Sequence, residues 1–531
     1  MRPTTHKVVI ADQVSPACSR TLERTDGIEV VLAAGAPPEK LREELRTATA
    51  LVVRSALQVT DELLEAGPEL RVIGRAGEGV DNIDLEAATR RGIVVMNTPG
   101  GNTFSAAEHA LSLLLSLARH IPQSNASLKG GAWERKRFVG VQLYEKVLGI
   151  VGMGKVGREV AQRACSFGMQ VIAHDPFLSE EMAQKLNVDF VPFEELLQKS
   201  DFITLHVPLT DETRRLIGAG ELRRCKKGVR LINTARGGLV DEQALAQAVR
   251  EGHVAGAALD VFETEPPTDR TILDLESIIT TPHLGASTVE AQERVAIWIA
   301  EQIVDFLHHG VIRNAVNLLP LDPKTAVLIA PYQDLAERLG KLQAQMRTGR
   351  LKEISVEYSG NVSEYPTAPI TSALLKGYFE SFRSGPVNAV NATYLAKSSG
   401  VRLSETRIAE HQDFANLISA TFTTSEGSTA IAGTLFGKKN PRIVMLDNYY
   451  FDALPVGEIL IVSNDDTPGM MGRIGTILGH RGINISFMSM GRDTPAGTAV
   501  AILNLDNPLP AAVLAEIQDT KGVLWARGVR L

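Results

Sequence analysis

Short apolar runs alternate with helical patterns through the first part of the chain. The runs occupy Val8–Ile10, Ile28–Leu32, Ala50–Val53, Arg71–Gly74 and Ile93–Val95. Runs of this length, separated by amphipathic segments, are typical of parallel strands joined by helices. A longer apolar pattern, Ser105–His120, then predicts a helix that enters the next unit and serves as a hinge between two lobes.

The same rhythm of strands and helices returns between residues 147 and 281. Its apolar runs are Val147–Val151, Gln170–Ala173, Phe202–His206, Val229–Asn233, Ala255–Asp260 and Ile278–Thr281. A second long helical pattern, Thr288–His309, is expected to bring the chain back to the first lobe. We therefore predict an α/β fold of two Rossmann-like, doubly wound lobes. The substrate lobe is discontinuous (residues 1–98 and 287–313), and the dinucleotide-binding lobe (residues 99–286) is inserted into it.

The pattern changes after residue 313. Asn314–Pro320 is predicted to be a linker, and residues 321–452 mix helices with strands such as Glu353–Tyr358 and Arg442–Leu446, as in an α+β domain. Residues 457–531 follow the order strand, helix, strand, strand, helix, strand. This order predicts a ferredoxin-like βαββαβ unit at the end of the chain.

Composition narrows the class of protein. The length of 531 residues predicts about three domains. The composition, 44% hydrophobic and 22% charged, is typical of soluble globular proteins. The net charge of −7 argues against a nucleic-acid partner, and no run of about 18 apolar residues indicates a membrane span. Cys18, Cys165 and Cys225 form no metal-binding pattern and are interpreted as reduced thiols. Because the first strand is predicted close to Met1, no room is left for a signal peptide, and a cytoplasmic protein is expected.

The stretch Lys146–Ala161 carries the most informative motif. Gly152, Gly154 and Gly157 follow an apolar run at G-x-G-x-x-G spacing, and a helical pattern begins at once. Glycines at these places allow a tight turn, the close approach of a pyrophosphate and close helix–strand packing, while the helix N-terminus attracts phosphate. The alternative is an ordinary turn between strand and helix in which the glycines stand by chance.

Asp175 indicates which dinucleotide would bind. It ends the next apolar run, 18 residues beyond Gly157, near the place where a carboxylate accepts hydrogen bonds from ribose hydroxyls. Pro176 and Phe177 follow, and no Arg stands beside the acid to accept a 2′-phosphate. NAD is therefore predicted in preference to NADP.

Two cations follow buried strands of the first lobe. Arg54-Ser55 comes directly after one apolar run, and Arg75-Ala76-Gly77 comes after the next. Because ligands bind beyond the carboxyl ends of parallel strands, the pair indicates an anionic substrate. The alternative is that each Arg is a solvated loop charge.

Three strand ends in the second lobe offer an Arg, a carboxylate and an imidazole. These segments are Asn233–Gly238, Asp260–Pro266 and Thr281–Gly285. The guanidinium of Arg236 could hold a substrate carboxylate in a bidentate fork. The imidazole of His283 could accept a hydroxyl proton while a hydride leaves for a nicotinamide, with Glu265 fixing its tautomer. Taken singly, His283 could be a loop or packing residue, and Glu265 could cap a turn.

These segments also match a known family. GIVGMGKVGREVA, NTARGGLVDEQAL, ALDVFETEPP and TPHLGAST resemble the D-isomer-specific 2-hydroxyacid dehydrogenases over roughly residues 7–313. The resemblance implies that Arg236 binds the substrate carboxylate and carbonyl, that His283 is the acid/base, and that Glu265 is its partner. It also implies a set of NAD contacts: Gly152, Gly154, Lys155, Val156, Gly157, Asp175, Pro176, His206, Pro208, Thr213, Thr234, Ala235, Asp260, His283 and Gly285.

Within the family, the chain is similar to the long members that oxidise 3-phosphoglycerate to 3-phosphohydroxypyruvate in L-serine biosynthesis. RAGEGVDNID resembles their loop on the phosphate side of the site. The substrate contacts that this implies are Arg54, Ser55, Arg75, Gly77, Asn102, Arg236 and His283. One departure is Glu78, which stands where relatives carry Thr or Ile; we expect its carboxylate to point away from the phosphate.

Two other functions stay open at this stage. A dehydrogenase for an unphosphorylated 2-hydroxy acid, such as lactate or glycerate, would need the same Arg, Glu and His but not the two arginines of the first lobe. An NAD-sensing interaction protein could share the architecture, although the complete catalytic set argues against it. Trp133-Glu134-Arg135 resembles the region in which family members cross between subunits, so a homo-oligomer, either a dimer or a tetramer, is expected.

The last part of the chain resembles regulatory modules. NDDTPGMMGRIGTILGHRGINISFMSMGR is similar to the ACT domain, which binds amino acids, and residues 321–452 resemble the intervening domain of the long members. The resemblance implies an L-serine effector bound by Asn464, Asp466, Gly469, Asn484 and Ile485. The alternative is that this domain only pairs sheets between subunits. Gly437–Arg442 is a basic turn, interpreted as a solvated surface turn rather than an anion site.

Overall fold

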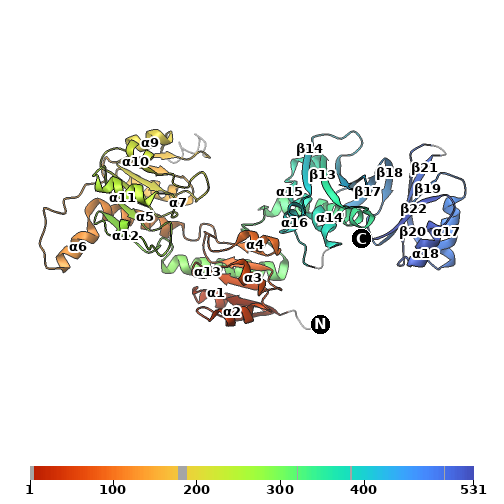
Figure 1. The fold of residues 1–531 in the computed structure, drawn as a ribbon, viewed down its shortest axis with the longest axis horizontal. Coiled ribbons are helices and arrows are strands. Elements are labelled where there is room, and N and C mark those ends of the chain that lie inside the picture. Colours follow the sequence, from red (N-terminus) through yellow and green to blue (C-terminus); the bar gives the residue numbers. More distant parts are fainter. Residues whose placement is uncertain (1–4, 178–187, 320, 383–384, 495–496) are drawn as a thin grey trace.

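The computed structural model describes residues 5–177, 188–319, 321–382, 385–494 and 497–531. Four sheets follow one another along the chain (Figure 1). The first two are parallel, the third is mixed, and the fourth is antiparallel. This confirms the fold class predicted from the sequence, while the residues at which the domains meet stay a prediction.

The first lobe is built on five parallel strands in the order β2-β1-β3-β4-β5. The strands are β1 (His6–Ile10), β2 (Ile28–Leu32), β3 (Ala50–Val53), β4 (Val72–Arg75) and β5 (Val94–Met96). The connecting helices are α1 (Ala17–Glu23), α2 (Pro38–Leu45), α3 (Asp61–Glu65) and α4 (Leu85–Arg90). Every residue of β3 is buried, and for this reason the strand is a continuous apolar run in the sequence rather than an alternating one.

Helix α13 (Val289–His309) completes this lobe from a distant part of the sequence. Thr288 caps its N-terminus by accepting a hydrogen bond from the Ala291 N–H. Ile299 and Ile303 pack so closely on β4 that a Cβ at Gly74 would lie 2.7 Å from each of them. The chain therefore returns to the first lobe, as the helical pattern predicts.

The second lobe is a seven-stranded parallel sheet in the order β12-β11-β10-β9-β6-β7-β8. Its strands are β6 (Val147–Val151), β7 (Gln170–His174), β8 (Asp189–Phe190), β9 (Phe202–Leu205), β10 (Val229–Asn233), β11 (Val254–Leu259) and β12 (Ile278–Thr280). Its helices are α5 (Thr103–Arg119), α6 (Ile121–Lys129), α7 (Lys155–Ser166), α9 (Phe193–Lys199), α10 (Ala219–Arg224), α11 (Glu242–Arg250) and α12 (Arg270–Leu273). The strand order reverses at β6, so β6 ends at the point where open α/β sheets bind ligands.

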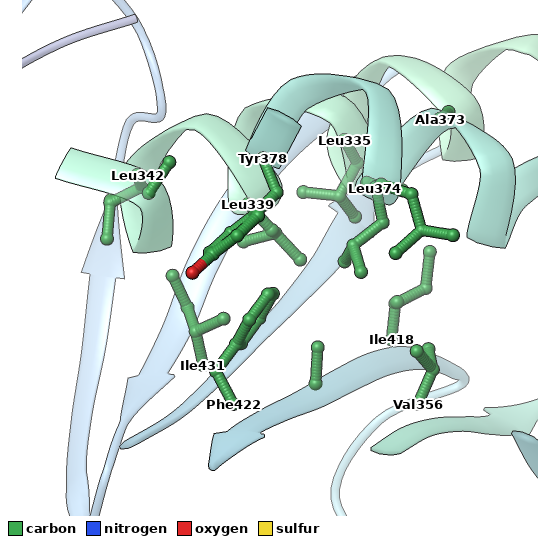
Figure 2. Packing of buried hydrophobic residues seen from close by; sticks show 14 of the residues in the cluster. Leu335, Leu339, Leu342, Val356, Ala373, Leu374, Tyr378, Ile418, Phe422 and Ile431 are labelled. Carbon is green, nitrogen blue, oxygen red and sulfur yellow. The ribbon is translucent and has the colours of Figure 1, made fainter. Parts of the chain in front are cut away.

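The third unit packs two helices on one face of a mixed sheet, in the order β14-β13-β15-β16-β17-β18. The strands are β13 (Leu351–Gly360), β14 (Arg402–Ile408), β15 (Asn416–Thr424), β16 (Ser428–Phe436), β17 (Asn440–Leu446) and β18 (Tyr449–Ala453). The helices are α14 (Pro323–Met346), α15 (Ala368–Glu380) and α16 (Ala392–Ser398), with a 3-10 turn η1 (Asn361–Glu364). Figure 2 shows Leu339 and Tyr378 directed at the sheet, where Tyr378 stacks on Phe422 with 5.1 Å between ring centroids.

The segment predicted to be a linker is held against the first lobe. Asn317 accepts a hydrogen bond from the Val95 N–H and donates one to the Ile93 carbonyl, both at 2.9 Å. These bonds fasten residues 314–319 to the edge strand of the first lobe. In the basic segment Gly437–Arg442, predicted to be a turn throughout, only residues 437–439 form the turn, because β17 begins at Asn440.

The fourth unit is an antiparallel sheet in the order β20-β21-β19-β22, which is the ferredoxin-like arrangement. Its elements are β19 (Glu458–Asp465), α17 (Met470–His480), β20 (Ile485–Arg492), β21 (Thr498–Leu505), α18 (Ala511–Gln518) and β22 (Val523–Arg530). The two helices cover one sheet face. On the other face, Ile459, Ile461 and Ile502 join the apolar core of the third unit, so the two units share one core.

Candidate active site

The glycine-rich turn between β6 and α7 has the geometry that its sequence predicts. Gly152 has a φ of 93°, in the left-handed region that favours glycine, and a Cβ there would lie 2.6 Å from the His206 carbonyl oxygen. A Cβ at Gly157 would lie 2.1 Å from the Gly152 carbonyl oxygen, so glycine lets α7 pack against β6. No neighbouring atom lies within 4 Å of the Cβ position at Gly154, which leaves room for a ligand phosphate at the start of α7.

Asp175 lies against this turn. At the end of β7, its Oδ2 accepts a hydrogen bond from the Met153 N–H at 2.8 Å, and its Oδ1 accepts one from the Phe177 N–H at 2.9 Å. Pro176 stands between the two residues of the second bond. The carboxylate is therefore held beside the glycine-rich turn, where binding of ribose hydroxyls requires an acid.

Other predicted cofactor contacts surround the same turn. The Lys155 Nζ donates to the Pro99 carbonyl at 3.1 Å and so reaches the segment that joins the two lobes. Thr213 donates to the Pro208 carbonyl at 2.7 Å and closes the loop after β9. Burial lowers the pKa of His206 to about 4, so this imidazole is neutral at physiological pH.

Side chains of the turn after β10 hold Arg236 in place. Asn233 donates to the Arg236 carbonyl at 2.9 Å and accepts a hydrogen bond from the Ala235 N–H at 3.1 Å. Thr234 lies in the same turn, and its buried hydroxyl has no partner among the described residues. Val156, predicted to contact the cofactor, packs against the apolar core of the lobe, so its backbone is the part left for a ligand.

His283 and Glu265 form a hydrogen-bonded pair, with 2.7 Å between Nδ1 and Oε2. The other oxygen of Glu265 accepts the Phe262 N–H at 3.1 Å. Burial alone would raise the pKa of Glu265, but the hydrogen bonds from His283 and Phe262 outweigh it, and the pKa lies below its usual value. Because an ionised carboxylate can only accept, Nδ1 carries the proton of a neutral imidazole, and Nε2 is the atom that can take up a substrate proton.

Asp260 organises the loop after β12. Its fully buried carboxylate accepts hydrogen bonds from the Thr281 hydroxyl at 2.6 Å and from the N–H groups of Leu284 and Gly285 at 2.7 and 2.9 Å. His109, on α5, approaches the same carboxylate at 3.0 Å. Burial opposes ionisation, but these bonds lower the pKa of Asp260. Asp260 was predicted to contact the cofactor, whereas His109 was not predicted to take part in the site.

Three guanidinium groups meet where the two lobes face each other. In the first lobe, Arg54 follows β3 and Arg75 is the last residue of β4. In the second lobe, Arg236 lies in the turn after β10. Burial, together with the positive charges of Arg236 and Arg54, lowers the pKa of Arg75 to about 10, although the carboxylates of Asp81 and Asp12 partly oppose this shift. Like charges this close repel one another, so an anion bound among them would stabilise the cluster.

Glycines make room for this cluster. A Cβ at Gly77 would lie 1.8 Å from Arg75 Nη1, and a Cβ at Gly79 would lie 2.4 Å from Arg236 Nη2. Arg236 Nε also lies 3.2 Å from Asp81 Oδ2, across the boundary between the lobes. The loop after β4 therefore packs directly on the arginine of the second lobe. Asp81 falls within RAGEGVDNID, but no sequence signal separates it from the other acids of that segment.

Asp12 fixes the loop that carries Arg54. Its Oδ2 accepts hydrogen bonds from the N–H groups of Arg54, Ala56 and Leu57 at 2.8, 3.2 and 3.2 Å. Ser55 lies in the same loop and is exposed. Asp12 has no sequence signal, because an acid just after a strand is common in loops of any function.

Several buried polar atoms around this space have no partner among the described residues. They are Arg75 Nε, Thr98 Oγ1, Asn102 Oδ1, Thr103 Oγ1 and Thr234 Oγ1. Buried polar groups are nearly always paired in proteins, so such atoms mark places where a ligand or water completes the hydrogen bonds. Asn102 was predicted to contact substrate, whereas Thr98 and Thr103 were overlooked. The direction of the Glu78 carboxylate stays a prediction.

The residues predicted to bind an effector fall into two groups. They are Asn464, Asp466 and Gly469 in one group, and Asn484 and Ile485 in the other. The first group lies near the end of β19 that pairs with Thr498, whereas Ile485, at the start of β20, pairs with Leu505. Thr498 and Leu505 are the two ends of β21, about 23 Å apart at a rise of about 3.3 Å per residue. The fold therefore does not bring both groups of one chain to a single ligand.

The described part of the chain offers neither a metal-binding cluster nor a membrane-spanning helix. Among these residues, no group of three or more His, Cys, Asp or Glu side chains could hold a metal ion. No described helix combines the length and the apolarity needed to cross a membrane. Cys18, Cys165 and Cys225 are free thiols.

Comparison with known proteins places this geometry in a family. The family model of the D-isomer specific 2-hydroxyacid dehydrogenase NAD-binding domain matches residues 111–285. Those of the D-3-phosphoglycerate dehydrogenase intervening domain and of the ACT domain match residues 328–447 and 459–522. A D-3-phosphoglycerate dehydrogenase of Archaeoglobus fulgidus is 42% identical over 99% of this chain and 100% of its own. The chain belongs to the D-3-phosphoglycerate dehydrogenase family.

Further relatives support this D-3-phosphoglycerate dehydrogenase family assignment. The enzyme of that name from Bacillus subtilis is 41% identical over 99% of both chains. A solved NAD-dependent formate dehydrogenase of Staphylococcus aureus, in complex with NAD, covers 58% of this chain and 97% of its own, with 31% identity and a TM-score of 0.52. This family member is thus an oxidoreductase that uses NAD, as its glycine-rich motif predicts.

Proposed function

We propose that the chain catalyses the NAD-dependent oxidation of D-3-phosphoglycerate to 3-phosphohydroxypyruvate, the first step of phosphorylated L-serine biosynthesis. The observation that carries the proposal is the cluster of Arg54, Arg75 and Arg236 next to the His283–Glu265 pair. A substrate with a carboxylate and a phosphate offers two anionic groups to these three cations. An unphosphorylated acid offers one and leaves the repulsion in the cluster largely unrelieved.

The carboxylate and the phosphate are assigned to different arginines. Arg236 follows the strand next to the catalytic pair, so it binds the carboxylate of the carbon skeleton as a bidentate fork and exchanges its contact with Asp81 for the substrate. Arg54 and Arg75, in the first lobe, bind the phosphate. Asn102, with its unpaired buried oxygen, lies at the start of the hinge helix and completes the substrate contacts.

The proton moves to His283. NAD, held by the glycine-rich turn and by Asp175, would supply the acceptor for the hydride that leaves the carbon carrying the hydroxyl group. Nε2 of His283 takes the hydroxyl proton, and the carbonyl of the product forms. Glu265, ionised and bonded to Nδ1, stabilises the imidazolium that results and keeps the ring oriented.

NADH formation with three parallel substrates tests this proposal. At alkaline pH we expect turnover of D-3-phosphoglycerate and at least about 100-fold lower kcat/KM with D-glycerate and D-lactate, since the phosphate contacts are missing. Equal or faster turnover of the unphosphorylated acids would reject the phosphate assignment. Tight NADH binding without turnover of any hydroxy acid would favour a sensing function instead.

We also propose that the enzyme is a cytoplasmic homo-oligomer. The described residues of α6 are all at least partly exposed although Ile121 and Leu128 are apolar, and Trp133 and Val139 in the following segment are 77% and 76% exposed. Exposed apolar side chains gathered on one arm are typical of a subunit interface. The free cysteines agree with a reducing compartment.

An L-serine effector is proposed at a site shared by two chains. Asn464 is buried with its Oδ1 unpaired among the described residues, and it lies at the opposite end of the sheet from Asn484. A second copy of the chain, turned end for end, would bring its own Asn484 group next to the Asn464 group of the first. One effector molecule could then contact both.

A further inference from the structure

The peptide that joins Phe262 to Glu263 is a junction between three parts of the site. A Cβ at Gly237 would lie 1.7 Å from its carbonyl oxygen, so the Arg236 turn packs directly on this peptide. The Phe262 N–H, one peptide earlier, donates to Glu265 Oε1 at 3.1 Å. The N–H of the peptide itself donates to Glu242 Oε1 at 2.7 Å.

Glu242 belongs to a different element from the loop that it contacts. It is the first residue of α11, and Asp241 already caps that helix by accepting a hydrogen bond from the Ala244 N–H at 3.0 Å. The side chain of Glu242 is therefore not needed as the cap. It is directed instead at the loop after β11, which carries Glu265.

The surroundings of Glu242 are electrostatically unfavourable for a carboxylate. It lines a cavity of about 170 Å³ together with Asp241, Glu263 and Asp269. The cation at this cavity is Arg215, which lies 3.7 Å from Glu263 and 4.0 Å from Asp241. Burial and the three neighbouring carboxylates raise the pKa of Glu242. The hydrogen bond from the Glu263 N–H explains why a carboxylate stands in this place. Capping of α11 does not explain it, because Asp241 already supplies the cap.

We propose that Glu242 is a positioning residue for both halves of the catalytic machinery. By holding the Phe262–Glu263 peptide, it sets the place of Glu265 behind the imidazole and of the turn that presents Arg236. The inference rests on the proposed function for the roles of those residues. A displacement of about 1 Å in such groups can lower turnover about 100-fold.

Two substitutions separate the reach of this side chain from its charge. Glu242→Asp keeps the charge at the start of α11 but is one methylene too short to reach the Glu263 N–H. Glu242→Gln keeps the length and an acceptor oxygen but loses the charge. Glu221→Asp is the matched control, because Glu221 in the same lobe accepts the Gly218 N–H at 3.1 Å and pairs with Arg224, outside the proposed site.

The readouts are kcat, the pH profile of kcat/KM and the Kd of NADH for each full-length variant. We expect Glu242→Asp to lower kcat about 10- to 100-fold with unchanged NADH affinity. The acid limb of its kcat/KM profile should move to lower pH, because an imidazolium that loses its carboxylate partner releases its proton more readily. Glu242→Gln should keep kcat within about threefold of wild type, and Glu221→Asp should change none of the three readouts.

Any of four results would overturn the proposal. These are an unchanged kcat and acid limb in Glu242→Asp, an equal loss in Glu221→Asp, an equal loss in Glu242→Gln, or a loss of NADH binding in Glu242→Asp. The first result would show that Glu242 has no effect on the catalytic groups. The second, third and fourth would attribute the loss to general stability, to charge and to the fold, respectively. Wild-type turnover decides the proposed function separately. If the wild type oxidises another 2-hydroxy acid instead, the comparison is made with that substrate, which uses the same His283–Glu265 pair.

Discussion

At the scale of single residues, the proposed choice of substrate depends on charged arginine side chains and on the hydrogen bonds that fix the loops carrying them. Arg75 is half-buried near two other guanidinium groups, and desolvation together with their charges lowers its pKa to about 10 and makes an anion a favourable neighbour. Arg54 lies in a loop that is fixed by three N–H groups donating to the Asp12 carboxylate. The proposed selectivity for a phosphorylated substrate would therefore depend on a few side chains, and backbone hydrogen bonds to Asp12 fix the loop that carries one of them.

Arg54→Leu tests this at one position. A hydrogen bond to a charged group contributes about 1.5–3 kcal/mol, so we expect kcat/KM for D-3-phosphoglycerate to fall roughly 10- to 100-fold. The low activity with D-glycerate should stay unchanged, since that substrate has no phosphate. Arg46→Leu, at an exposed arginine that follows α2, is the control and should affect neither substrate. An equal loss with both substrates in Arg54→Leu would instead indicate a general disturbance of the lobe.

At the scale of elements, the site is made by loops at strand ends and by glycines that let elements approach. The turn from β6 to α7 depends on Gly152 and Gly157, because side chains there would collide with backbone atoms. The Arg236 turn and the Glu265 loop likewise touch through Gly237. These contacts are between backbones, which cannot move aside as side chains can, so substitution has a large effect.

Gly157→Ala tests the packing of α7 on β6. The new Cβ would lie 2.1 Å from the Gly152 carbonyl oxygen, so the helix must shift away from the turn. We expect at least a tenfold weaker NADH affinity and a lower Tm, measured by titration and thermal unfolding. Gly220→Ala on α10 is the control, since no neighbouring atom lies within 4 Å of its Cβ position; it should raise stability by about 0.5–1 kcal/mol. NADH affinity and Tm equal to wild type in Gly157→Ala would contradict the packing argument.

At the scale of the whole molecule, distant segments must come together for each site to exist. The active site combines loops of the first lobe with loops of the second, and α13 returns to the first lobe after the second is complete. The last two units share one apolar core, so a ligand bound to the fourth unit would act on a structure that includes the third. The two groups of predicted effector residues lie at opposite ends of one sheet, so binding of one ligand by both groups would require a second chain.

Mixing two single variants tests the shared effector site. Asn464→Ala and Asn484→Ala should each abolish L-serine binding by the homo-oligomer, measured by calorimetry. After subunit exchange, a mixed dimer has one site with both residues intact and one with neither, so roughly a quarter of the wild-type number of sites should return. Exchange without any recovered binding would show that the two residues do not share a site. Failure of the wild type to bind L-serine would reject the effector itself.

Much of the fold follows from the sequence because its determinants are local. The strand β3 is recognisable since both faces are buried, and the alternation of strands and helices predicts the parallel sheets. The glycines of the β6–α7 turn and the Thr288 cap of α13 act within a few residues of themselves. Such preferences can be interpreted from the residues alone, and so could the pairing of Glu265 with His283 through the family resemblance.

Only the tertiary structure decided the contacts between segments far apart in the chain. Asp12, Asp81 and His109 take part through loops and helices that the sequence does not bring together. The same holds for Glu242, whose partner lies on another loop. A side-chain hydrogen bond depends on positions set by the packing of whole elements, and no local pattern encodes them. The sequence therefore determined the elements and the chemistry they can carry, and the packing determined which groups meet.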